Sequence, residues 1–136
     1  MRDQGMNGIA DVLYDAYNRH DAAAVAKLHD ADGTHEDIAM GHSKVGQTAI
    51  ADGLQKFFGW FPDAHWTPHV VIADPFGSVT ITYLLTATLQ AQMGRTIARG
   101  QRISLRGAHV LHVRGRLIHS SEDYWDAATF QKQLNA

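Results

Sequence analysis

The sequence contains no cysteine among its 136 residues, which excludes disulfide bonds, thiolate catalysis and sulfur-ligated metal sites. It has only three prolines, and no apolar run approaches the ~20 residues that a membrane-spanning helix needs. Neither sign of charge dominates, since 12 Lys and Arg stand against 14 Asp and Glu. This balance does not favour nucleic acid or an acidic membrane as a partner. The N-terminus lacks the apolar segment of a signal peptide, so we expect a cytoplasmic protein.

A hydrophobic content of 45% suits one globular domain spanning residues 1–136. Apolar residues recur at helical spacing in three segments, at 9–17, 22–28 and 46–61. We expect a short strand at 34–40, after a break at 30–33. Four segments then alternate or carry strand-forming residues: 65–73, 78–92, 101–113 and 117–125.

A closing helix is expected from residue 127, with Asp126 as its N-cap, and Asp21 is expected to cap the second helix. Helices grouped first and a strand meander last predict an α+β fold. A curved, mostly antiparallel sheet wrapped by the N-terminal helices would form a cone-shaped barrel with an open mouth.

The segment SSEDYWD at 120–126 places three carboxylates where a strand runs into the closing helix. With Asp126 assigned as a cap, Glu122 and Asp123 remain as candidate acid/base groups. His109 lies on the otherwise apolar face of its strand. It is either a hydrogen-bonded core histidine or an imidazole that lines a pocket. Which acid shares its face depends on the register of the hairpin near residue 115.

Two hairpin loops are possible. A two-residue loop of Arg114 and Gly115 would bring Glu122 to the face of His109. A three-residue loop at 114–116 would pair Val113 with Leu117 instead, and Gly115 could adopt the left-handed conformation that such loops need. We prefer the second loop because it matches two apolar residues, and it places on the face of His109 a set of alternate residues, Leu117, His119, Ser121 and Asp123.

The histidine spacings argue against a metal site. His109 and His112 point to opposite faces of one strand. His65 and His69 would be ~13 Å apart on another strand, too far for one ion. We therefore expect no metal site. On the first strand, Asp37 faces either the cone interior or solvent, and alternation leaves both open.

Three segments resemble a known family: GQTAI…FFGWFPDAHW, RGAHVLHVRGRLIHSSEDYWD and the closing FQKQL. They are similar to the SnoaL-like polyketide cyclases of the nuclear transport factor 2-like superfamily, over nearly the whole chain. The resemblance implies an α+β cone with a deep apolar pocket that takes a hydrophobic small molecule. It also implies a homodimer formed through the outer face of the sheet.

The resemblance further implies that Asp123 is a general acid/base and that His109 assists it. The cyclase reaction is an intramolecular aldol closure that requires no metal or organic cofactor. An apolar pocket would raise the pKa of the carboxyl group towards neutrality, as burial does. Four aromatic residues are candidate pocket walls, with plain core packing as the alternative for each: Trp60, Phe61, Trp66 and Tyr83.

The segment GTHEDIAMG also resembles the part of ketosteroid isomerases that carries their aspartate base, which would fall on Asp37. The oxyanion-hole tyrosine of that family would fall at Leu13, next to Tyr14, and His109 occupies the position of its oxyanion-hole aspartate. These departures argue against steroid isomerisation, although Asp37 and Tyr14 remain candidate substrate contacts. The alternative outside enzymology is a small-ligand-binding or dimerisation module of the same fold.

Overall fold

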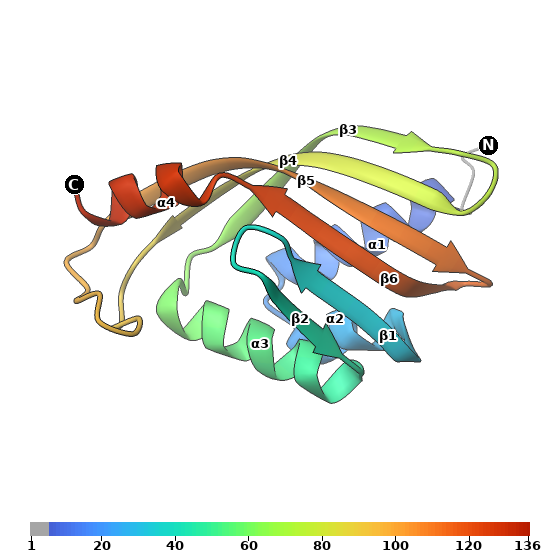
Figure 1. Cartoon of the computed structure of the whole chain (residues 1–136), viewed down its shortest axis with the longest axis horizontal. Helices are drawn as coiled ribbons and strands as arrows, with labels where there is room; N and C mark the ends of the chain where they lie inside the picture. Colours follow the sequence, from blue (N-terminus) through green and yellow to red (C-terminus); the bar gives the residue numbers. More distant parts are fainter. Residues whose placement is uncertain (1–5) are drawn as a thin grey trace.

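A computed structural model of the chain describes residues 6–136 and shows four helices and six strands within them (Figure 1). The helices are α1 (Met6–Asn18), α2 (Ala22–Lys27), α3 (Gln47–Trp60) and α4 (Ala127–Leu134). The strands are β1 (His29–Asp37), β2 (His42–Val45), β3 (His65–Ala73), β4 (Ser78–Thr88), β5 (Arg102–Arg114) and β6 (Leu117–Trp125).

The six strands form one sheet in the order β2-β1-β6-β5-β4-β3. Strands β1 and β6 run parallel, and the other neighbouring pairs are antiparallel. Helix α1 packs against β3 and β4, and α3 packs against β1 and β2, so the N-terminal helices cover one face of the curved sheet. The α+β fold expected from the element order is confirmed.

The core lies between the helices and the inner face of the sheet. Alternation along β4 predicts this face correctly, since its odd-numbered residues Val79, Ile81, Tyr83 and Leu85 are at most 6% exposed. The even-numbered positions of β4, several of them threonines, belong to the outer face. The two expected helix caps are also confirmed, because the Asp21 and Asp126 carboxylates accept hydrogen bonds from backbone N–H groups of α2 and α4.

The start of the first strand differs from the prediction. Strand β1 begins at His29 rather than at residue 34, and the expected break at 30–33 lies inside it. The pairing of β1 with β6 shifts between His29 and Thr34, so this part of the strand lacks the alternation that reveals a strand. Gly33 marks the irregularity, because a Cβ there would lie 2.9 Å from the His29 Cβ atom. Strand β2 is short and was not predicted.

The predicted hairpin loop is wrong, but the predicted side of Asp123 is confirmed. The loop has two residues, Gly115 and Arg116, between the paired residues Arg114 and Leu117. The register then shifts by one residue near the start of β6. As a result Leu117 is 38% exposed on the strand, whereas the following residue is fully buried. This bulge restores the parity that a three-residue loop would have given.

No helix within residues 6–136 is long and apolar enough to cross a membrane.

Candidate active site

Asp123 lies half-buried on the inner face of β6. The Tyr83 hydroxyl on β4 donates a hydrogen bond of 2.6 Å to its Oδ1 atom. Burial raises the pKa of Asp123 to about 7, and the neighbouring Asp37 raises it further, while the bond from Tyr83 opposes the shift. A carboxyl group with this pKa exchanges protons readily at neutral pH, which is the property that general acid/base catalysis needs.

His109 on β5 is the direct register partner of Asp123 on β6. It is only 3% exposed, and its Nδ1 atom lies 3.3 Å from the Tyr14 hydroxyl oxygen on α1. Its Nε2 atom is buried and has no hydrogen-bond partner among residues 6–136. Burial, together with the nearby His35, holds the pKa of His109 well below its usual value, so the ring is neutral at physiological pH.

Asp37 on β1 is the register partner of Asp123 on β6, at the edge of β6 that faces away from β5. This pairing decides whether Asp37 faces the interior or solvent, which strand alternation left open. Its half-buried side chain lies on the same sheet face as Asp123. Burial raises its pKa, while hydrogen bonds from the Met40 backbone and the Trp125 side chain oppose that shift. Two carboxyl groups with raised pKa values therefore lie side by side on β1 and β6.

His35 is a further interior residue that the sequence did not single out. Its Nδ1 atom lies 2.8 Å from the Ser121 Oγ atom, and its ring meets that of His109 edge-on at 5.5 Å. Burial lowers the pKa of His35 to about 4, so it too is neutral. Its spacing of two from Asp37 is the signal that they share a face. The parallel pairing of β1 with β6 was needed to bring it to His109.

The predicted pocket walls lie in or beside the core. Phe61 is fully buried, Trp66 is 7% exposed and Tyr83 is 3% exposed, whereas Trp60 is half-buried at the end of α3. Close ring contacts join aromatic side chains of α1, α3 and its C-cap, β3, α4 and β6 into one continuous series, which runs through Tyr14, Tyr17, Trp66, Phe57, Phe61, Phe130 and Trp125. Aromatic side chains therefore pack beside His109, whose ring contacts Tyr14 and Tyr17.

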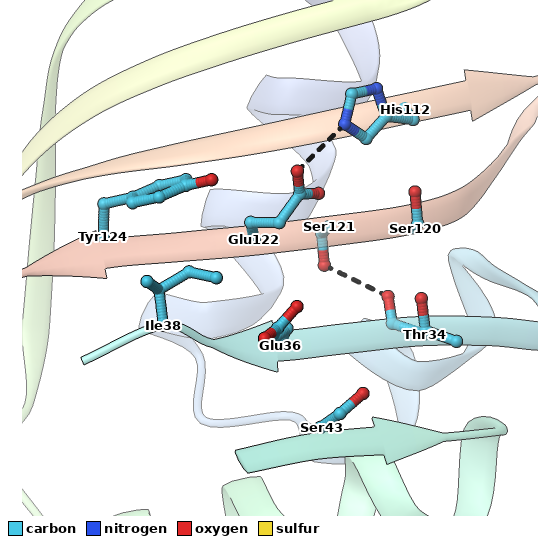
Figure 2. Close-up of a pocket in the computed structure, with 9 residues that line it drawn as sticks. All are labelled: Thr34, Glu36, Ile38, Ser43, His112, Ser120, Ser121, Glu122 and Tyr124. Atoms are coloured by element: carbon cyan, nitrogen blue, oxygen red, sulfur yellow. Dashed lines mark hydrogen bonds and ion pairs between the residues drawn. The ribbon is translucent and has the colours of Figure 1, made fainter. Parts of the chain in front are cut away.

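Two open hollows lie on the other side of the sheet. One, of about 360 Å³, is lined from β1, β2, β5 and β6, and Figure 2 shows Glu122 at its centre, paired with His112 at 3.2 Å. The second, of about 430 Å³, lies over β4 and β5. Neither is lined by Asp123 or His109, and Tyr124 borders both. Glu122 therefore belongs to the outer face, as the preferred parity predicted.

The fold and this site define a class of protein: an α+β domain with a curved sheet whose inner face carries an aspartate–histidine pair. The sequence of residues 10–120 matches the SnoaL-like domain family, and the chain belongs to that family. No curated protein matches the chain.

Solved structures share the fold at low sequence identity. A candidate polyketide cyclase from Pseudomonas putida KT2440 superposes with a TM-score of 0.87 at 18% identity, over 96% of this chain and 98% of that one. Another, from Xanthomonas campestris pv. campestris, gives 0.84 at 23% identity, over 95% and 96%. A hypothetical protein of ketosteroid isomerase-like fold from Catenulispora acidiphila, solved with trimethylamine, gives 0.80 at 21% identity, over 93% and 92%.

Proposed function

We propose that the protein, acting as one domain, is an enzyme that performs acid/base chemistry on a hydrophobic, carbonyl-bearing small molecule. Aldol ring closure, isomerisation and dehydration all begin with the same step, the removal of a proton from carbon beside a carbonyl group. The observation that carries the proposal is the half-buried Asp123, whose pKa of about 7 lies within reach of neutral pH. The family match and the fold shared with candidate polyketide cyclases support it.

In the proposed reaction, the Asp123 carboxylate takes a proton from the carbon next to the substrate carbonyl. The electron pair of that C–H bond forms an enolate, and Asp123 becomes a carboxylic acid. In a cyclisation the enolate carbon then attacks a second carbonyl carbon, forming a C–C bond and an alkoxide. The proton returns from Asp123 to that alkoxide, so the carboxylate is regenerated and no external acid or base is consumed.

His109 is proposed to stabilise the enolate oxygen. When the Tyr14 hydroxyl donates to Nδ1, the neutral ring carries its hydrogen on Nε2, the atom without a partner among residues 6–136. Burial also raises the pKa of Tyr14, so the phenol keeps the proton that it donates. A buried N–H donor without a partner gains more from a developing negative charge than a solvated donor would.

Asp37 and the aromatic residues around the polar groups are proposed to bind the substrate. Asp37 lies beside Asp123, and Trp60, Phe61, Trp66 and Tyr83 supply apolar surface. Because His109 is only 3% exposed, the substrate reaches its Nε2 atom only when the neighbouring side chains move apart.

A non-catalytic ligand-binding or dimerisation module is the second candidate function. The close packing around His109 favours it, since the ring is only 3% exposed and contacts Tyr14, Tyr17 and His35. For either function we propose a homodimer formed through the outer sheet face. Exposed apolar residues on that face support this assembly, among them Val70, Ile72 and Tyr124.

Proton exchange at an activated carbon tests the catalytic proposal without knowledge of the natural substrate. The probe is 2-tetralone, a bicyclic ketone, incubated in D₂O and followed by proton NMR. We expect the protein to accelerate loss of the C1 proton signal and Asp123→Asn to abolish the acceleration. Glu122→Gln, which removes the neighbouring carboxylate on the outer face, is the matched control and should keep it. Equal rates for the protein and Asp123→Asn would favour the binding module.

A further inference from the structure

Gly107 occupies an unusual place for a glycine, the interior of a long central strand. Glycine weakens strands, and one in a strand interior often marks a close approach of another group. The backbone conformation does not require a glycine here, since the φ angle of Gly107 is not positive. What requires it is a neighbour: Gly107 on β5 is the register partner of Tyr83 on β4.

The Tyr83 ring lies directly over the Cα atom of Gly107. A Cβ atom built on Gly107 would overlap the Tyr83 hydroxyl oxygen and the ring carbon Cζ, and it would lie 2.8 Å from Cε2. Tyr83 thus crosses β5 at the one position without a side chain, and its hydroxyl reaches Asp123 on β6, two strands away, at 2.6 Å. Any larger residue at 107 would displace the ring.

We propose that Gly107 is a positioning residue for Asp123. Because Gly107 has no side chain, the Tyr83 ring can cross β5 and its hydroxyl can donate a hydrogen bond to the carboxylate on β6. The catalytic meaning of this role rests on the proposed function, but the hydrogen bond between Tyr83 and Asp123 does not. Several titratable groups surround Asp123 and are unchanged by substitution at 107, namely Asp37 on β1, His109 on β5, and Tyr14 and Tyr17 on α1.

The test is an NMR titration of the protein labelled with ¹³C-aspartate, in which the Asp123 signal is assigned by its loss in Asp123→Asn. The Tyr83 hydroxyl stabilises the ionised carboxylate, so Gly107→Ala and Tyr83→Phe should each raise the pKa of Asp123, by about one pH unit or more. Their effects should not add in the double variant, because both break the same bond. Gly59→Ala is the matched control, since nothing lies within 4 Å of a Cβ there. It should leave the Asp123 titration unchanged.

A second measurement covers the case in which Gly107→Ala folds poorly. Tyr83→Ala empties the space that the new Cβ needs, so Gly107→Ala should lower the urea midpoint when Tyr83 is present and should not lower it further when it is added to Tyr83→Ala. An equal loss of the midpoint on adding Gly107→Ala in both backgrounds would overturn the proposal. So would an unchanged Asp123 pKa in Gly107→Ala beside a raised one in Tyr83→Phe. Because neither readout needs turnover, a failure of the 2-tetralone experiment leaves this test intact.

Discussion

Asp37 and Asp123 lie side by side as register partners on the parallel strands β1 and β6. Neighbouring strands are about 4.8 Å apart, so each carboxylate senses the charge of the other. The negative charge of Asp37 is one cause of the raised pKa of Asp123, after burial. We therefore predict that the titration of Asp123 depends on the charge state of Asp37.

Asp37→Asn should therefore lower the pKa of Asp123, because it removes the adjacent negative charge and keeps the shape of the side chain. The pH at which catalysis of 2-tetralone exchange is half-maximal should move downwards with it. Titration of the ¹³C-aspartate signal of Asp123 measures the pKa directly. Glu36→Gln, on the exposed face of the same strand, is the control. An Asp123 pKa that is equal in the protein and in Asp37→Asn would show that the two carboxylates are uncoupled.

Asp123→Asn should make the protein more stable at alkaline pH while removing the proposed catalysis of 2-tetralone exchange. The pKa of Asp123 is about 7 when folded, above its ordinary value of 3.8, so between these values the folded state holds a proton that the unfolded state lacks. The free energy of unfolding therefore falls as pH rises from 3.8 to 7, by at most roughly 4 kcal/mol because solvent reaches part of the side chain.

Thermal unfolding of the protein and of Asp123→Asn at pH 5 and pH 8 measures this difference. The melting temperature of Asp123→Asn, relative to that of the protein, should increase as pH rises. Asp126→Ala is the control. Hydrogen bonds from Thr129 and the Ala128 backbone lower the pKa of that capping carboxylate, so its contribution to stability is present above the ordinary value of 3.8 and is lost only below it. The stability gap between Asp126→Ala and the protein should therefore be the same at pH 5 and pH 8. A stability gap between Asp123→Asn and the protein that does not change with pH would count against the raised pKa.

The Tyr14–His109 pair should contribute more to function than to stability. Replacing both with apolar residues, His109→Leu with Tyr14→Phe, removes a buried Nε2 atom without a partner among residues 6–136, so the melting temperature should stay level or rise. His109→Leu alone leaves the Tyr14 hydroxyl without the histidine and should be less stable than the double variant by about 1–3 kcal/mol. Exchange into 2-tetralone should be lost in both. A double variant that keeps its exchange activity would remove His109 from the proposed mechanism.

Local patterns predicted the elements of this fold well. The alternation of β4, the helical spacing of α3 and the carboxylate caps Asp21 and Asp126 all depend on residues close in sequence. Strand β1 was misjudged at its start because the irregular pairing near Gly33 removes the alternation on which prediction depends.

The site was harder to predict because it depends on register across strands. Asp123 was placed on the face of His109 through a three-residue loop that does not form. The two-residue loop and the bulge near His119 together give the same parity. The contacts of His35 with Ser121 and His109 could not be foreseen, since they require the parallel pairing of β1 with β6. Such pairing joins segments far apart in the chain and leaves no local pattern.

The outer sheet face provides the last prediction, that the protein is a dimer whose interface contains Tyr124. This residue is 44% exposed and borders both hollows of that face, so we expect it at the centre of the interface. Light scattering should give twice the mass of the chain, and Tyr124→Lys should give the mass of one chain, because an interface centre does not tolerate an unpaired charge. Val12→Lys on α1, a similarly exposed apolar residue outside the sheet, is the matched control and should remain dimeric. A protein that is monomeric at high micromolar concentration would contradict the prediction.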